Sequence, residues 1–498
     1  MTISFSQKLI LSLLGSFLLA PHGYLFGQGA PHNAFHSTEL SQLTPVSPNA
    51  AALGKFGNIP VGLYTGIPQV SVPIYSIKYK DLQLPVSVDF HLGGVKVEEV
   101  ASWTGLSTAL NAGGVITRTV RGQPDERYNL YSTAVSNILS LDNGDPQNYS
   151  NLYTQLGLVN QAQLDTEPDL YYFNFGGYSG KFYMGSDGKT FYPIPYQKIK
   201  IYPEAGYTRW VIITPEGTKY IFGTSLDNSR NAIETTTTTN FSLNPSTGEV
   251  SQANVPMSTP TAWYLVDVVS ANSNIISLFY TQESYSFHTT LNETDHQLLM
   301  DEVVESPCIS CSPYYATPRY RYISYSKNDM LGQRLSQIAF GKHRLVFNGD
   351  SCRYDLPGTK SLHNIQLFSD SLSAPLKTFQ FYYSYFSSFG VSASPVQQCN
   401  TPAEELAAKY RLRLDSLVET GQLGSRKAPY LFTYDATPLP SRYSRFLPEV
   451  FAQDYWGFYN GALNNLNQAG LPTLIPILDE DIYGNGTTYT IIPGAVRT

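Results

Sequence analysis

The sequence predicts an all-β protein of antiparallel hairpins, arranged as a shell or sandwich, with a few short helices. Apolar and polar residues alternate with a period of two, turn residues recur roughly eight to twelve positions apart, and strand formers are abundant. The 498 residues include 37 Tyr and 25 Phe, and 42% are hydrophobic. The charged fraction of 14% argues against a coiled coil, and the formal net charge of −7 provides no basic surface for nucleic acid.

Residues 1–27 are predicted to be a signal peptide. Lys8 supplies a positive charge, and Leu9 to Ala20 form an apolar core that is too short to cross a hydrocarbon layer of ~30 Å. We expect cleavage between Gly27 and Gln28 and export to the extracellular space or the cell surface. An uncleaved N-terminal anchor is the alternative. No later stretch is apolar enough for a transmembrane segment, and no Cys follows the signal to accept a lipid.

A polar arm, residues 28–46, is expected to precede an N-terminal β domain at residues 47–165. Val70–Ile77 and Leu84–Leu92 alternate strictly and predict half-buried strands. Val95–Val100 and Val115–Val120 follow glycine pairs and predict two more strands. The polar stretch from Arg127 to Asp165 is expected to hold one or two short helices.

Residues 166–498 are predicted to be a β-hairpin-repeat region. Each unit joins an apolar strand, a turn rich in Pro, Asp, Asn or Gly, and an aromatic strand, because Gly supplies the positive φ that tight turns need. The period is roughly twenty residues, without strict identity. The predicted strands are Tyr171–Phe175, Gly180–Met184, Trp210–Thr214, Thr218–Gly223, Trp263–Val269, Ile275–Tyr280, Leu335–Phe340 and Arg344–Phe347.

Two segments depart from the hairpin pattern. The threonine tract Glu234–Asn240 is expected to be a solvated loop or an edge strand. Thr401-Pro402-Ala403-Glu404 has the sequence of a helix start, with a hydroxyl cap, Pro at the first position and Glu at the third. This pattern predicts a short helix that ends at Ala408.

The four cysteines are Cys308, Cys311, Cys352 and Cys399. Cys308 and Cys311 have the spacing of a zinc knuckle or redox pair, but a second such element is missing. In an exported protein, two disulfides are favoured over a metal site. Four thiols allow three pairings, of which we favour Cys352–Cys399 with Cys308–Cys311.

Motifs for catalysis and cofactor binding are absent from the sequence, so we expect a protein that is not an enzyme and holds no cofactor or metal. The acidic groups are Glu98-Glu99, Asp301-Glu302 and Asp479-Glu480-Asp481. Neighbours on a strand point to opposite faces, which rarely places two carboxylates across a sugar. Asp479–Asp481 lacks the spacing of a calcium loop. His91 lies on an alternating strand, where a structural role is favoured over a catalytic base.

The aromatic run Phe379–Phe386 has two interpretations. Aromatic side chains fill large β cores, where a Tyr ring is buried and its hydroxyl reaches water. Exposed aromatic rows also stack on sugar rings. The core interpretation is favoured, and a glycan platform is the alternative.

Several strings resemble the N-terminal region of large secreted bacterial RHS/YD-repeat proteins, in the same order along the chain. They are structural strings of Gly, Trp and Tyr, and none is catalytic. They are Ser47–Val61, Tyr64–Pro68, His91–Trp103, Leu110–Arg118, Glu167–Asp169, Phe173–Phe182, Trp263–Leu265 and Gln453–Gly461. One departure is Gly105-Leu106-Ser107-Thr108, where the family usually carries a Trp.

The resemblance implies a β-rich lead-in to YD hairpins that form a hollow cage, often around a C-terminal effector. The chain stops at Thr498, where that family's repeat array would begin, so we expect a truncated product, one piece of a split system or a free-standing relative. We therefore expect an exported, non-enzymatic scaffold for cell-surface contact or effector encapsulation, with a downstream YD-repeat or effector polypeptide as partner. A glycan-binding module that uses Tyr and Trp faces, with surface glycans as partner, is the alternative. A secreted glycosidase ranks third.

Overall fold

A computed structural model describes most residues between Val70 and Gly461, all within a compact unit that spans Gln42–Thr498. The described ranges are 70–122, 124–125, 130–142, 144–160, 166–185, 187–243, 249–253, 255–289, 292–297, 319–388, 391, 404–442, 453–454, 456–459 and 461. The predicted signal peptide, the predicted cleavage residues Gly27 and Gln28, and the predicted polar arm lie outside these ranges. The predicted boundaries after residues 27, 46 and 165 stay predictions.

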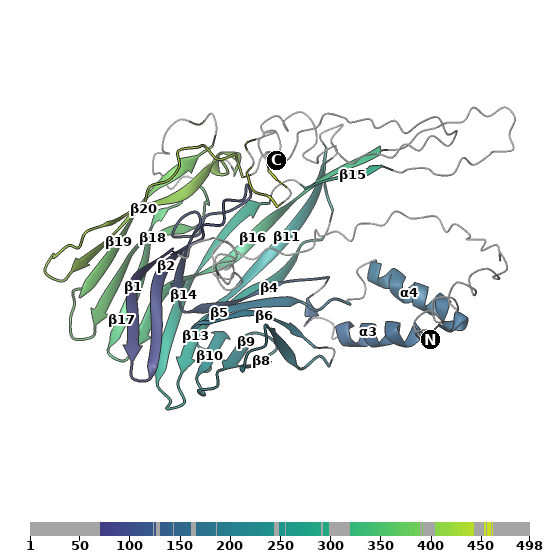
Figure 1. Cartoon of the computed structure of the whole chain (residues 1–498), viewed down its shortest axis with the longest axis horizontal. Helices are drawn as coiled ribbons and strands as arrows, with labels where there is room; N and C mark the ends of the chain where they lie inside the picture. The colour runs from purple at the N-terminus through teal and green to yellow at the C-terminus, as the bar shows by residue number, and fades with distance from the viewer. Residues whose placement is uncertain are drawn as a thin grey trace, which may run out of the picture. The chain divides into compact units, whose positions relative to one another are not determined.

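The described chain is mostly antiparallel β-sheet with a few short helices, as the sequence predicted (Figure 1). A small sheet contains β1 (Val70–Tyr79), β2 (Leu82–Phe90) and β3 (Thr108–Ala112), in that order. Buried and exposed residues alternate along β2, because successive side chains of a strand point to opposite faces. The period-two pattern therefore predicted β1 and β2 correctly.

A second, larger sheet contains all the remaining strands. They are β4 (Gly114–Thr119), β5 (Leu170–Phe175), β6 (Tyr178–Met184), β7 (Phe191–Ile194), β8 (Lys200–Glu204), β9 (Arg209–Ile213), β10 (Lys219–Gly223), β11 (Ile233–Leu243), β12 (Val250–Gln252), β13 (Met257–Val269), β14 (Ile275–His288), β15 (Asn292–Gln297), β16 (Arg319–Phe340), β17 (His343–Cys352), β18 (Lys360–Ser369), β19 (Lys377–Ser387), β20 (Tyr410–Gly421) and β21 (Tyr430–Leu431).

The predicted hairpins are confirmed at β5–β6, β9–β10, β13–β14 and β16–β17. The turn between β9 and β10 shows why they form. Gly217 has φ +80°, in the left-handed region that favours glycine, and the Thr214 amide donates to the Thr218 carbonyl at 3.0 Å. The hairpins differ in length. The same kind of unit therefore recurs along the chain, but without a fixed period.

Two long strands change neighbours along their length. β13 lies between β10 and β14 near Val269, and between β4 and β11 near Trp263. β16 pairs with β14 on one side and with β17 and then β11 on the other. As a result, β11, β13, β14 and β16 close a ring of antiparallel pairings.

The prediction for the threonine tract is wrong. Glu234–Asn240 forms the middle of β11, which pairs with β13 on one side and β16 on the other. Threonine is β-branched and suits a strand, and its hydroxyl finds partners inside the sheet. The Thr236 and Thr261 hydroxyls lie 2.8 Å apart, and both residues are fully buried. A polar tract therefore occupies a central position.

The prediction of a strand over Val95–Val100 is also wrong. This segment is a loop with one isolated bridge, between Lys96 and Phe458. The Val97 amide donates to the Gly457 carbonyl at 2.9 Å, and the Val97 side chain is buried. A segment far away in the sequence therefore supplies a main-chain hydrogen bond that a neighbouring strand would otherwise provide.

The predicted helices within Arg127–Asp165 are confirmed as α3 (Leu130–Leu141) and α4 (Tyr149–Asn160), joined by a short 3-10 helix, Pro146–Asn148. A helix also follows Thr401-Pro402-Ala403, which lie outside the described residues. It is α5, Glu404–Ala407, in which the Ala408 amide donates to the Glu404 carbonyl at 3.0 Å. No helix in the described part of the chain is long and apolar enough to cross a membrane.

The main hydrophobic core joins the two sheets. It includes Val72, Ile77, Leu84 and Val88 from the small sheet and Phe340, Leu345, Ile365 and Phe379 from the large one. A second part of the same core is aromatic, and within it the ring centroids of Tyr171 and Phe182 lie 4.9 Å apart and those of Trp210 and Trp263 lie 6.0 Å apart. The described Tyr and Phe residues of this cluster thus pack against one another and against Trp.

Candidate functional site

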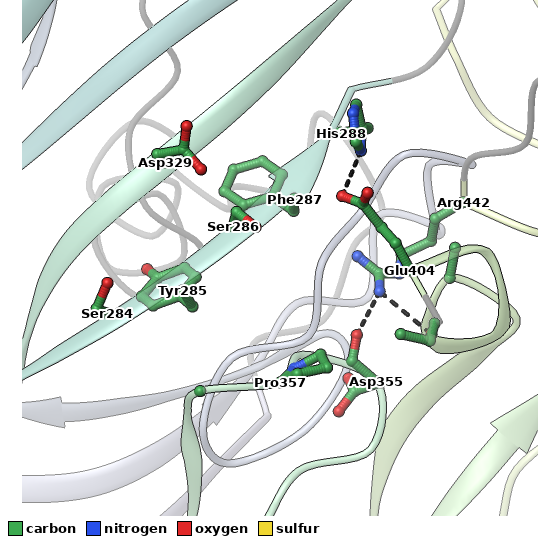
Figure 2. A pocket seen from close by; sticks show the side chains of 13 residues that line it. Ser284, Tyr285, Ser286, Phe287, His288, Asp329, Asp355, Pro357, Glu404 and Arg442 are labelled. Carbon is green, nitrogen blue, oxygen red and sulfur yellow. Dashed lines mark hydrogen bonds and ion pairs between the residues drawn. The ribbon is translucent and has the colours of Figure 1, made fainter. Parts of the chain in front are cut away.

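A cavity of about 500 Å³ lies where β14, β16, the β17–β18 loop and α5 meet (Figure 2). Its size falls in the range typical of small-molecule sites. Its lining residues are Ser284, Tyr285, Ser286, Phe287 and His288 of β14, Asp329 of β16, Asp355, Pro357 and Gly358 of the loop, Glu404, Ala407 and Ala408 at α5, and Arg442. The cavity is therefore the best candidate for a site in the described structure.

Aromatic side chains of β14 form one wall of this cavity. Tyr285 and Phe287 are two residues apart on the strand, so their side chains point the same way. Both are buried, and their ring centroids lie 6.5 Å apart with planes inclined by 20°. This wall offers two aromatic rings and the hydroxyl of Tyr285.

His288 and Glu404 form the most chemically suggestive pair. His288 Nδ1 lies 2.5 Å from Glu404 Oε1, and the contact ties the end of β14 to the start of α5 (Figure 2). The His288 side chain is 9% exposed and that of Glu404 is 48% exposed. Glu404 is thus the member of the pair that solvent reaches.

Asp355 also lines the cavity, and both of its carboxylate oxygens accept hydrogen bonds from other residues of the chain. The Arg353 guanidinium donates to both of its carboxylate oxygens, at 3.0 and 2.7 Å, and the Leu412 amide donates to Oδ2 at 3.0 Å. Burial alone would raise the pKa of Asp355, but the guanidinium of Arg353 and then that of Arg442 hold it below its usual value. Asp355 is therefore ionised at neutral pH and unsuited to donate a proton.

Arg442 and Arg411 are buried and bind main-chain carbonyls. Arg442 donates to the carbonyls of Asp355 and Ala407, and Arg411 donates to those of Pro440 and Val97, at 2.8 and 2.6 Å. Burial lowers the pKa of Arg442 to about 10 and that of Arg411 to about 9. Both stay charged at neutral pH, and their hydrogen bonds fix loops in place.

The remaining carboxylate of the cavity also has a basic partner. Asp329 lies 3.2 Å from Lys327 Nζ and is half exposed. Each acidic side chain that lines the cavity thus contacts a cation, or a histidine in the case of Glu404. Among the described residues, no group of three or more His, Cys, Asp or Glu side chains is placed to hold a metal ion.

The structure does not gather the residues singled out in the sequence. His91 follows β2, and its amide donates to the Ser107 carbonyl at 2.8 Å. Glu98 and Glu99 lie in the loop that was expected to be a strand. None of the three lines the cavity. Asp301-Glu302 and Asp479–Asp481 lie outside the described residues.

Cys352, at the end of β17, forms a disulfide. Its partner is outside the described part of the chain, as are Cys308, Cys311 and Cys399. The pairing of Cys352 with Cys399, and of Cys308 with Cys311, stays a prediction.

The aromatic run Phe379–Phe386 lies on β19 and is used mainly for packing. Phe379 and Phe381 are buried. The Tyr383 hydroxyl donates to the Leu362 carbonyl at 2.9 Å, and the Tyr385 hydroxyl accepts from the Tyr354 amide at 3.0 Å. Tyr382 is the one exposed aromatic residue of the run, at 48%. A continuous glycan platform on this strand is therefore not formed.

Sequence reasoning missed the residues that carry the charge of the cavity. Glu404 was noted only as a helix-start residue, and His288, Arg353, Asp355 and Arg442 were not noted at all. The one available signal was Arg353-Tyr-Asp355, an opposite-charge pair six residues after the end of the predicted strand Arg344–Phe347. The partners of these side chains lie far away in the sequence, so no spacing rule identifies them.

Comparison with known proteins gives little support for any assignment. No family model matches the chain, and no curated protein matches it. The chain is similar to a mutant Photorhabdus luminescens Tc holotoxin pore, with TM-score 0.34 and 13% identity over 79% of this chain and 16% of that chain. It is also similar to a TcdB2-TccC3 structure, with TM-score 0.32 and 12% identity over 74% of this chain and 16% of that one.

A third similar structure is the N-terminal domain of the effector protein SpvB from Salmonella typhimurium. Its TM-score is 0.31, with 11% identity over 72% of this chain and 99% of that domain. The structural neighbours are thus toxin-complex and effector proteins, and the chain spans about a sixth of the length of the first two. With TM-scores this low, they carry no argument about the fold or function of this chain.

Proposed function

We propose that this chain is an exported, non-enzymatic β scaffold, the N-terminal part of an RHS/YD-repeat-type protein that works in cell-surface contact or effector encapsulation. The observation that carries the proposal is how buried charge is used. The buried arginines bind main-chain carbonyls of distant segments, and the acids of the cavity contact basic side chains.

Arg118 illustrates this use of charge. Its side chain is fully buried, and its Nε and Nη2 donate to the Pro260 carbonyl at 3.0 and 2.6 Å. Its Nη1 lies 3.4 Å from Asp169 Oδ2. Arg353 likewise donates to the Ala101 carbonyl at 2.8 Å. Arg118 thus joins β4 to β13, and Arg353 holds the loop at Ala101. Buried cations that are satisfied by the main chain stabilise the arrangement of distant segments, which is a task of a scaffold.

The sheet edges support the same proposal. β20 pairs with β19 on one side and with the short strand β21 on the other, and the amides of Leu106, Lys427 and Phe432 donate to further carbonyls of β20. Covered edges resist unspecific strand pairing. The strings that resemble RHS/YD-repeat proteins supply the family context, in which such a β lead-in precedes hairpins that enclose an effector.

The test is co-expression of the full chain with the polypeptide encoded downstream. We expect the two to co-purify and the downstream polypeptide to gain resistance to protease. In parallel, glycoside, ester and peptide substrates are offered to the purified chain. Turnover that disappears in Glu404→Gln, a change at the half-exposed member of the His288 pair, would show that the chain is an enzyme.

Glycan binding is the second candidate, and exposed tyrosines at β7 favour it. Tyr192 and Tyr196 are 48% and 81% exposed, and the rings of Tyr183 and Tyr192 lie 5.8 Å apart. Exposed Tyr faces can stack on sugar rings. Binding on a glycan array that is lost in Tyr196→Ala and kept in Tyr382→Ala would support this site, and an array without binding removes the candidate.

A further inference from the structure

The cavity beside β14 contains a buried cation with an unused donor. Arg442 lines the cavity and is 4% exposed. Its Nη2 donates to the carbonyls of Asp355 and Ala407, but its Nε is buried and has no hydrogen-bond partner. Buried polar groups are nearly always paired, and a charged donor that is left unpaired carries a large desolvation cost. An acceptor is therefore missing at Arg442.

Positive charge exceeds negative charge among the described buried side chains at this end of the cavity. Arg353, Arg411 and Arg442 are buried, and the buried carboxylate near them is that of Asp355, which accepts from Arg353 with both oxygens. Burial, and then the charge of Arg442, lowers the pKa of Arg411 to about 9, so these two guanidinium groups lie near each other. Three cations thus share one carboxylate, and a second anionic group would balance them.

The other acidic side chains near these arginines do not supply that group. Glu404 and Glu99 are only partly buried, so solvent screens their charges. Three of the acids also contact a basic side chain of their own. These contacts join Glu283 to Arg334 at 3.3 Å, Asp329 to Lys327 at 3.2 Å and Glu404 to His288 at 2.5 Å.

The wall of the cavity on β14 is aromatic. Figure 2 shows Arg442 between Glu404 and Asp355, with Tyr285 and Phe287 on the side of β14. Both rings are buried and belong to an apolar cluster with Met330 and Leu356. Aromatic faces contribute most when they contact an apolar body. The cavity therefore offers a charged donor at one end and an apolar surface at the other, within about 500 Å³.

This arrangement selects among classes of ligand. A cationic ligand would meet the guanidinium of Arg442, and an apolar ligand without an acceptor would leave Nε unpaired. A small inorganic anion would satisfy Arg442 but leave the aromatic wall without a partner. A neutral hydroxyl would accept from Nε, but an ionised acceptor forms a hydrogen bond about twice as strong.

We propose that this cavity binds a small organic carboxylate, with the carboxylate at Arg442 and an apolar body against Tyr285 and Phe287. The planar guanidinium group suits a carboxylate in shape as well as in charge. The volume of the cavity lies within the range of small-molecule sites. This site is additional to the scaffold role and does not depend on it.

The experiment is a ligand-detected NMR titration of the full chain with three compounds. Phenylacetate is expected to bind with a Kd of about 5 mM or tighter. Phenylacetamide has the same shape without the charge and is expected to bind at least ~10-fold more weakly, because it loses the charged hydrogen bond. Acetate keeps the charge but lacks the apolar body, and is also expected to bind at least ~10-fold more weakly.

Variants locate the binding in the cavity. Arg442→Lys keeps a positive charge but removes the Nε donor, and is expected to weaken phenylacetate binding at least ~10-fold. Ser286→Leu adds bulk to the lining without altering a buried charge, and is expected to abolish binding. The matched control is Thr281→Leu, at an exposed position of the same strand that does not line the cavity. It should bind phenylacetate like the wild type, and thermal unfolding checks that each variant is folded.

Three outcomes overturn the proposal. They are no binding of phenylacetate by the wild type, equal affinity for phenylacetate and phenylacetamide, and binding that a folded Ser286→Leu variant retains. The first two use the wild-type chain alone, so they do not depend on the folding of a variant. Co-purification with a downstream polypeptide is a separate measurement and tests the scaffold role.

Discussion

Asp355 and Arg353 show what a single buried ion pair contributes to this protein. Their side chains are 0% and 2% exposed, and two hydrogen bonds join them. Pairs of this kind gain little over well-packed apolar residues, but removing one partner leaves an uncompensated charge in the interior. At the scale of the residue, the polar interior is therefore sensitive to single changes.

Asp355→Asn is expected to lower the free energy of unfolding by about 3–5 kcal/mol at pH 7. The pKa of Asp355 is lowered in the folded state, so its carboxylate stabilises the fold above the unfolded pKa of ~3.9. This contribution is lost as pH falls through the lower, folded pKa. Urea unfolding at pH 7 and at steps below pH 4 measures the difference between wild type and variant, which should shrink in acid.

Asp329→Asn is the matched control, because Asp329 also contacts a cation but is half exposed. Its cost is expected to stay below about 1 kcal/mol. An equal loss of unfolding free energy in both variants would contradict the idea that burial makes the Asp355 ion pair important. A loss in Asp355→Asn that stays the same in acid would contradict it too.

β11 shows how an element gains its place from its neighbours. Between Thr235 and Thr238 it pairs on both sides, so every amide of this stretch points toward a partner strand. The polar sequence suggested exposure, but the hydroxyls pair inside the sheet, as between Thr238 and Asn328 at 2.9 Å. The strand is central although its composition is polar.

Thr236→Pro is expected to lower the free energy of unfolding by about 3 kcal/mol or more, because it removes a ladder hydrogen bond from a central strand. Gln422→Pro is the control. It lies at the second position of a turn closed by the Gly424 amide and the Gly421 carbonyl, where Pro is favoured. Thermal or urea unfolding measures the stability of both variants. If the two prolines lower the free energy of unfolding equally little, β11 is an edge strand.

Long-range arginine contacts connect the whole molecule. Arg411 donates to the Val97 carbonyl, 314 residues away, and to the Pro440 carbonyl. Val97 lies in the loop 95–100, and its amide also donates a hydrogen bond to the Gly457 carbonyl. A segment near the beginning of the described chain is thereby fixed to segments near its end.

Arg411→Met is expected to open this connection while the sheets remain folded. Two buried carbonyls lose their donor, at a cost of about 1–3 kcal/mol each before relaxation. Hydrogen exchange followed by mass spectrometry should show faster exchange in residues 95–100, with unchanged exchange in β13. Unchanged exchange in 95–100 would show that Arg411 does not hold the loop.

The candidate site was the least predictable part of the protein. Its cavity takes residues from β14, β16, a loop, α5 and Arg442, and their charges are balanced by partners that spacing does not indicate. His91 and the acidic pairs, which spacing did indicate, are placed elsewhere. Chemistry that depends on residues from distant segments cannot be read from a local pattern.

By itself, the sequence determined the all-β class, the strands of the regular hairpins and the two helices before β5. These features depend on alternation, turn residues and propensity, which act over a few residues. Tertiary structure alone decided that the threonine tract is central, that Val95–Val100 is a loop, and which carbonyl each buried arginine binds. Those outcomes depend on which segments meet in space, because a hydrogen-bonding group removed from water takes whatever partner the fold brings to it.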